Sequence, residues 1–131
     1  MQPDSKWVAL LDEDPDDLVI IQQGIKNWGP EITLRNFKTF SQFEQTLQTE
    51  HPLHALIILN GLSPANMEID WIKGFRHSDL YAKIPIVILA EDYWEEQKQL
   101  YSTVDVEDYQ TKPVNQEELK SFILKIKDIL G

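Results

Sequence analysis

Residues 55–61 read ALIILNG, an apolar run that is closed by Asn60 and Gly61. A short, continuous run of aliphatic residues is typical of a strand that is buried on both faces, as in a parallel sheet. The apolar content stops at Asn60, and asparagine before glycine favours a turn. We therefore predict a central strand over Ala55–Leu59 whose carboxyl end carries Asn60.

Four further apolar runs lie on either side of this strand, and helical patterns separate them. We predict strands at Trp7–Leu11, Ile32–Phe37, Ile84–Leu89 and, more weakly patterned, Val104–Tyr109. Between the first two runs, Asp14 and Pro15 indicate a helix start, and Gly29 a helix end. That helix has one apolar face: Leu18, Ile21, Ile25 and Trp28.

Other helix starts are indicated by capping-box spacing, in which an N-cap residue is followed three positions later by an acid. The pairs are Ser41 with Glu44, Asp92 with Glu95, and Asn115 with Glu118. A third helix, about 66–76, is interrupted by Gly74. The last helix has the clearest apolar stripe: Leu119, Phe122, Ile123, Ile126 and Leu130.

Alternating strands and helices require right-handed crossovers, which predicts the α/β class. We expect a doubly wound five-stranded parallel sheet in the flavodoxin-like order 2-1-3-4-5, with helices on both faces. Ligands of such sheets bind beyond the carboxyl ends of the strands, at the switch point between strands 1 and 3. Asp12, Glu13 and Asn60 are expected to meet there.

Composition narrows the function. The chain of 131 residues has a net charge of −10 and no cysteine, which excludes disulfides and thiolate sites and argues against nucleic-acid binding. No apolar run approaches the roughly 20 residues of a membrane span, and no secretory signal is recognisable. We expect a cytoplasmic protein forming one domain over residues 1–131, with no output domain and no membrane association.

An acidic pair after the first strand, a polar residue at the end of the third, and Lys112-Pro113 after the fifth occur together. This set resembles the response-regulator receiver domain of two-component signalling, across essentially the whole chain. The resemblance implies that Asp12 and Glu13 are the acidic pair that helps to hold Mg²⁺. It also implies that Asn60 stands where receivers carry the phosphoacceptor aspartate. A carboxamide is a poor nucleophile and supplies no negative charge to a cation.

The resemblance assigns further positions. Ala90 stands where receivers carry the Thr or Ser that contacts the phosphoryl group, and Tyr109 matches the aromatic switch position. Tyr109 is expected either to rest inward above Ala90 or to be an ordinary edge-strand aromatic. Lys112 matches the lysine that pairs with the acceptor, and we expect it to turn to Asp12 or Glu13 instead. Pro113 is a candidate for a cis peptide bond.

These features lead us to expect a phosphorylation-independent protein-interaction module that is not an enzyme. No cofactor is expected to be required, and any Mg²⁺ at Asp12 and Glu13 should bind weakly. The expected partner is a protein, such as a histidine kinase, a phosphotransfer protein or a downstream signalling protein. The expected binding surface is the face formed by the fourth helix, the fifth strand and the fifth helix. Trp94, Tyr101 and Tyr109 are the candidate contacts on it; the alternative is that these aromatic residues pack in the core. Formation of a homodimer through the same face is a further alternative.

Two alternatives remain at this point. The chain could be an active phosphorelay receiver with an acceptor other than residue 60. It could instead be a flavodoxin-like binder of a small ligand, although the acidic loop at residues 12–17 would repel a phosphate. His51 and His54 flank a predicted loop and His77 follows the third predicted helix, so surface positions are expected for the three histidines rather than a metal site.

Overall fold

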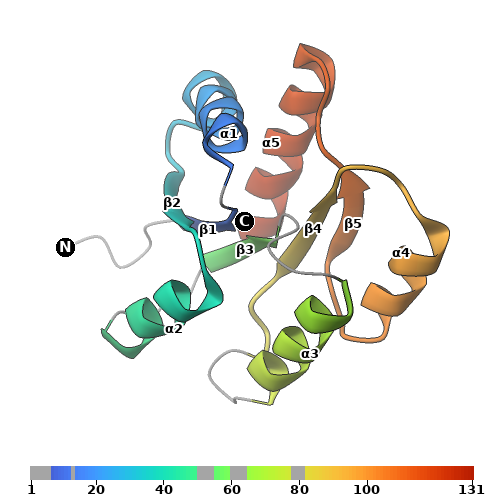
Figure 1. Cartoon of the computed structure of the whole chain (residues 1–131). Helices are drawn as coiled ribbons and strands as arrows, with labels where there is room; N and C mark the ends of the chain where they lie inside the picture. Colours follow the sequence, from blue (N-terminus) through green and yellow to red (C-terminus); the bar gives the residue numbers. More distant parts are fainter. Residues whose placement is uncertain (1–6, 13, 50–54, 60–64, 78–81) are drawn as a thin grey trace.

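The computed structural model of this chain describes residues 7–12, 14–49, 55–59, 65–77 and 82–131 (Figure 1). Strands and helices alternate along these residues, as the sequence predicts. The strands are β1 (Trp7–Leu11), β2 (Thr33–Phe37), β3 (Ala55–Leu59), β4 (Ile86–Ala90) and β5 (Asp108–Thr111). The helices are α1 (Pro15–Trp28), α2 (Phe40–Thr49), α3 (Ala65–Arg76), α4 (Glu95–Ser102) and α5 (Gln116–Leu130).

The strands form one parallel sheet in the order β2-β1-β3-β4-β5, which confirms the predicted topology. In the pairing of the central strands, Leu11 stands opposite Leu59, so β1 and β3 end at the same level. Ala90 stands opposite Thr111 at the ends of β4 and β5. The carboxyl ends of all the strands therefore share one edge, as a parallel sheet requires.

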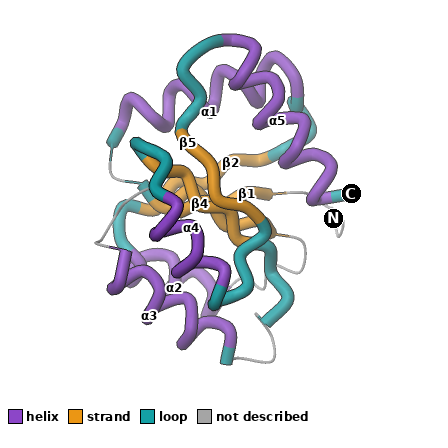
Figure 2. Tube along the Cα trace, turned by 90° about the vertical axis from the view of Figure 1, so that its right-hand side faces the viewer, coloured by secondary structure: helices purple, strands orange, loops and turns teal. Residues whose placement is uncertain are grey.

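Helices cover both faces of the sheet (Figures 1 and 2). Helices α1 and α5 lie together on one face, and α2, α3 and α4 lie on the other. The alternation of side chains along a strand divides the core accordingly. In β4, Val87 and Leu89 pack beneath α1 and α5, whereas Ile86 and Ile88 pack beneath the other three helices.

The two halves of the core differ in chemistry. The side under α1 and α5 consists mainly of aliphatic residues and includes four fully or nearly fully buried residues of α5: Leu119, Phe122, Ile123 and Ile126. The other side is rich in rings, with Trp71 stacked between Phe40 and Phe75 at centroid distances of 4.6 and 5.0 Å. It also contains Tyr101 and Tyr109.

Several helix starts follow the local signals, and two do not. Asp14 accepts a hydrogen bond from the Asp16 amide, and Asn115 accepts one from the Glu118 amide, as predicted. Helix α2 begins earlier than its predicted cap at Ser41, because Thr39 Oγ1 accepts from the Gln42 amide at 3.1 Å. Helix α4 begins later than the predicted cap at Asp92, with Trp94 at the cap position.

The fifth strand also lies further along the chain than predicted. Residues 103–105 form a turn in which Asp105 has a positive φ of 59°. The ladder to β4 begins only when the Glu107 amide donates to the Ile86 carbonyl at 2.7 Å. Val104 is apolar because it is buried in the core, not because it belongs to the strand. Among the described residues, no helix is both long and apolar enough to cross a membrane.

Candidate functional site

The residue that follows β1, Asp12, is buried at the carboxyl edge of the sheet with 3 % of its surface exposed. Its Oδ1 accepts a hydrogen bond from the Asp14 amide at 2.9 Å. The side-chain amide of Asn36, on β2, donates to the backbone carbonyls of Leu10 and Asp12 at 3.0 and 2.9 Å. These bonds fix the turn from β1 into α1 and hold the Asp12 carboxylate beneath the first turn of that helix.

Two predicted site residues, Glu13 and Asn60, lie outside the described residues. The described residues nearest to them show where β1 and β3 end. Since Leu11 and Leu59 are paired, the chain leaves β1 and β3 at the same edge, as the prediction of a shared site requires.

Lys112, which follows β5, reaches two carboxylates. Its Nζ lies 2.8 Å from Asp17 Oδ2 on α1 and 2.5 Å from Glu91 Oε1 after β4. Of the two predicted ion partners, Asp12 is therefore not the one that Lys112 contacts, and Glu13 lies outside the described residues. The Asp12 carboxylate accepts from the Asp14 amide before α1, whereas the Asp17 carboxylate, in the first turn of α1, stands within reach of the ammonium group.

The pKa of Lys112 reflects this environment. Burial lowers the pKa by removing water from the ammonium group, but the hydrogen bonds and the charges of Asp17 and Glu91 outweigh burial and raise it overall. The lysine is thus firmly protonated. It ties the start of α1 to the loop that follows β4, across the carboxyl edge of the sheet.

The peptide bond before Pro113 is trans, as are all the peptide bonds of the described residues, so the predicted cis bond is wrong. The trans form of an X–Pro bond is favoured by about 0.5–1 kcal/mol, and only a particular turn reverses that preference. Here the Lys112 amide continues the ladder by donating to the Ala90 carbonyl at 3.0 Å. The chain then runs directly to the cap of α5 at Asn115.

Ala90 and Tyr109 lie on the same face of the sheet and pack in the same cluster. Tyr109 is 6 % exposed, so it rests inward. Its ring stacks on Tyr101 at 5.6 Å and meets Tyr93 edge-on at 5.8 Å, and its hydroxyl donates to Gln97 Oε1 at 3.1 Å. Burial raises the pKa of Tyr109, although a backbone hydrogen bond from Trp94 works against the rise.

A buried carboxylate lies beneath this ring cluster. Glu68, on α3, is 1 % exposed, and its Oε1 accepts a hydrogen bond from the Tyr101 hydroxyl at 2.5 Å. Burial, followed by the bond to Glu68 and the charge of that carboxylate, raises the pKa of Tyr101 well above its usual range. The prediction did not single out Glu68. Its spacing from Ile72 and Phe75 places it on the buried stripe of α3, which is the signal that was available.

The described residues provide little for a metal ion. Among them, no group of three or more His, Cys, Asp or Glu side chains could hold one. One oxygen of Asp12 is engaged by the Asp14 amide, and Asp17 is paired with Lys112. Mg²⁺ prefers several oxygen ligands in octahedral geometry, and Asp12 contributes to such a set only together with groups outside the described residues.

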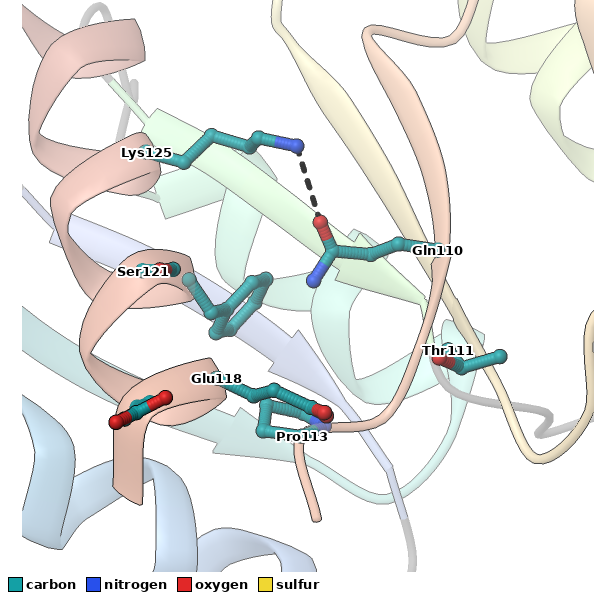
Figure 3. Close-up of a pocket in the computed structure, with 8 residues that line it drawn as sticks. Gln110, Thr111, Pro113, Glu118, Ser121 and Lys125 are labelled. Carbon is teal, nitrogen blue, oxygen red and sulfur yellow. Dashed lines mark hydrogen bonds between the residues drawn. The ribbon is translucent and has the colours of Figure 1, made fainter. Parts of the chain in front are cut away.

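The face of α4, β5 and α5 carries some of the predicted aromatic contacts but not others. Tyr101 and Tyr109 belong to the core, whereas Trp94 is 58 % exposed. Between β5 and α5 lies a surface pocket of about 400 Å³ that is lined mostly by polar residues (Figure 3). Lys125, on α5, reaches across it to Gln110 Oε1 at 3.1 Å and to Asp108 Oδ2 at 2.6 Å.

No protein-family model matches the sequence, and no curated protein matches it either. Solved structures do match. A response regulator from Thermotoga maritima has a TM-score of 0.79 at 13% sequence identity, over 96% of this chain and 98% of that chain. A response regulator receiver domain from Rhodospirillum rubrum has a TM-score of 0.73 at 19% identity, over 92% of this chain and 89% of that one.

A third match is the Mn²⁺-bound form of the response regulator Rcp1, with a TM-score of 0.72 at 19% identity over 94% of this chain and 92% of that one. The three matches span nearly the whole of this chain and nearly the whole of each neighbour, and the strand order is the predicted one. The chain therefore has the fold of the response-regulator receiver domains.

Proposed function

We propose that this protein is a signalling module of the two-component type that binds partner proteins without being phosphorylated, and that it is not an enzyme. The observation that carries the proposal is Asn60, which follows β3 directly in the sequence of a chain with the receiver fold. Formation of an acyl phosphate requires a carboxylate at the acceptor position. With an amide at that position, no phosphoryl group forms for the side chains at positions 90, 109 and 112 to contact or respond to.

The arrangement around Lys112 supports the same conclusion. Its ammonium group is held by Asp17 and Glu91, which belong to the first turn of α1 and the loop after β4. The lysine thus links these two segments by itself. Ala90 has no hydroxyl with which to contact a phosphoryl group, and Tyr109 is already buried against Tyr101. The inward arrangement of the rings needs no phosphorylation.

We propose that Mg²⁺ is not required and binds weakly. Asp12 supplies one buried carboxylate, but Asn60 brings no charge, and Mg²⁺ gives up its waters reluctantly. The neighbour whose structure contains Mn²⁺ indicates that the fold can hold a divalent cation. Residues 12, 13 and 60 of this chain would decide whether it does so here.

The partner proteins, we propose, are those of a two-component pathway in the cytoplasm, such as a kinase, a phosphotransfer protein or a downstream component. They would contact the face of α4, β5 and α5. The exposed Trp94 and the pocket between β5 and α5 lie on this face and support its choice.

Incubation with acetyl phosphate and Mg²⁺, followed by intact-mass measurement, tests the proposal. The wild-type protein should gain no phosphoryl group. The variant Asn60→Asp restores the carboxylate and is the matched control for whether the surroundings still permit the reaction. If the wild-type protein gains a phosphoryl group on an acid near the carboxyl edge, the chain is an active receiver with a different acceptor.

A further inference from the structure

The corner between β4 and α4 exposes two adjacent aromatic residues. Tyr93 is 49 % exposed and Trp94 is 58 % exposed. Trp94 also occupies the N-cap position of α4, where its side chain makes no capping hydrogen bond. Serine, threonine, asparagine or aspartate at a cap stabilises a helix relative to an apolar residue. The corner therefore combines an unfavourable cap with exposed apolar surface.

Breaks in local sequence rules without a compensating gain in folding are expected at functional sites. Trp and Tyr are also the residues most often found as central anchors of protein interfaces. The presence of an aromatic ring at position 93 is partly explained by its edge-on contact with Tyr109. No comparable ring contact accounts for Trp94 among the described residues, so its exposure points to recognition.

The surroundings of the two rings are acidic. Residues 91–96 read EDYWEE, and all six are exposed; we call this segment the acidic aromatic corner. Lys98 is the only basic residue within α4. Its Nζ lies 5.7 Å from the centre of the Tyr93 ring, within the distance at which a cation is attracted to an aromatic face. The corner thus already accepts a cation from its own chain.

The negative charge of the corner determines which class of molecule can bind to it. A second copy of the chain, pairing symmetrically through the corner, would bring acid against acid, and like charges across an interface oppose binding. A nucleic acid or another anionic surface would be repelled in the same way. Arginine and lysine side chains satisfy both features of the corner, because they pair with carboxylates and stack on aromatic rings.

We propose that the acidic aromatic corner docks a basic segment of a partner protein, whose arginine or lysine side chains lie against Tyr93 and Trp94. The surrounding carboxylates orient the segment and speed its approach. This inference rests on the proposed function, since it names the chemistry of the partner that the interaction module would bind. It adds that the corner is sufficient to hold such a segment without phosphorylation.

Titration of the ¹⁵N-labelled protein with two synthetic peptides of equal length tests the proposal by NMR. One peptide alternates arginine with leucine, and the other alternates glutamate with leucine. The arginine peptide should shift the Trp94 indole resonance and the amides of residues 91–96, and added salt should weaken its binding. Trp94→Ala should lower the affinity about tenfold or more, as expected for a central aromatic anchor.

Because the whole chain is acidic, non-specific attraction needs its own controls. Glu95→Gln combined with Glu96→Gln should weaken binding more than Asp70→Asn combined with Asp128→Asn, which removes equal charge from exposed positions on α3 and α5. Leu124→Ala removes exposed apolar surface from α5 and should leave the affinity unchanged. Circular dichroism checks that each variant is folded.

The proposal is overturned if the Trp94 variant binds as well as the wild type, or if both charge pairs weaken binding equally. It is also overturned if sedimentation shows a dimer that Trp94→Ala dissolves, because the occupant would then be a second copy. Repeating the titration with acetyl phosphate and Mg²⁺ distinguishes failure of the proposed function from failure of the docking inference. Binding that appears only with the phosphodonor would contradict the proposed function, whereas no binding under either condition would contradict the docking inference alone.

Discussion

The segments that precede α4 and α5 both have the spacing of a capping box, but only the segment before α5 makes the capping hydrogen bond. Before α5, Asn115 Oδ1 accepts from the Glu118 amide at 2.8 Å, and Glu118 Oε1 accepts from the Val114 amide at 3.1 Å. Before α4, Asp92 and Glu95 have the same spacing, yet the helix begins only after Trp94. The local signal is therefore sufficient at one corner and is overridden at the other.

Tertiary contacts explain the difference. At the α4 corner, Lys112 pairs with Glu91, and the Tyr93 ring rests edge-on against Tyr109, so two of the four residues between β4 and α4 are held by other parts of the chain. At the α5 corner, Val114 is 81 % exposed, and no comparable contact of its side chain among the described residues competes with the cap. Helix α5 is thus fixed by its cap and its apolar stripe, whereas α4 depends on its buried residue, Tyr101.

Tyr101→Ala should have the largest effect, because Tyr101 is the buried residue of α4. Removing a large buried ring costs about 3–5 kcal/mol of unfolding free energy. Urea unfolding followed by circular dichroism measures the loss, and hydrogen exchange should show the amides of α4 exchanging faster than those of α5. Equal loss of protection in both helices would contradict the view that α4 depends on this contact alone.

Tyr101→Phe should have the next largest effect. The ring remains, but the Glu68 carboxylate loses the hydroxyl that donates to it at 2.5 Å. A buried hydrogen bond lost in this way costs about 1–3 kcal/mol. The control is Tyr109→Phe, whose hydroxyl bonds to Gln97 at 3.1 Å in a less buried position and should matter less. A larger loss in the control would place the support of α4 at Tyr109 instead.

The comparison of corners also shows how far the sequence predicts the molecule. The apolar runs predict the strands because a strand buried on both faces is apolar along its whole length. They also predict the strand order, because the crossovers between parallel strands are right-handed. Apolar stripes at helical spacing likewise predict the buried faces of α1 and α5. The partners of Lys112 were not predictable, because Asp17 has the pattern of an ordinary acid in a first helical turn. Its contact with a residue 95 positions away depends on how α1 is rotated above the sheet.

A cap exchange probes the two corners at a smaller scale. Asn115→Ala should destabilise the protein by about 1 kcal/mol, since the cap bond to Glu118 is lost. At the other corner, Trp94→Asn should be more stable than Trp94→Ala by about 0.5–2 kcal/mol, because only the amide can cap α4. Comparing these two variants with each other removes the contribution of the indole ring. Equal stabilities would mean that the backbone at residue 94 is held away from capping geometry.

Alkaline pH should reveal the smallest effect, that of Lys112. The pKa of this lysine is raised above its ordinary value of 10.5, so the folded state binds its proton more tightly than the unfolded state does. Its contribution to stability is therefore complete below about pH 10.5 and is lost as the pH rises through the folded-state pKa. Because Glu91 is largely exposed, the ion pairs together should contribute about 1 kcal/mol or less.

The substitution Lys112→Met measures this contribution. The difference in unfolding free energy between the variant and the wild type should be present at pH 8 and should shrink above about pH 10.5, where Lys112 of the unfolded wild-type chain loses its proton before the folded one does. Tyr101 also destabilises the folded state at alkaline pH, since its raised pKa keeps it protonated there while the unfolded chain ionises. Both proteins carry Tyr101, so this second contribution cancels in the difference between Lys112→Met and the wild type. A difference that stays constant across this pH range would mean that the methylene chain of Lys112, and not its charge, holds α1 to the loop after β4.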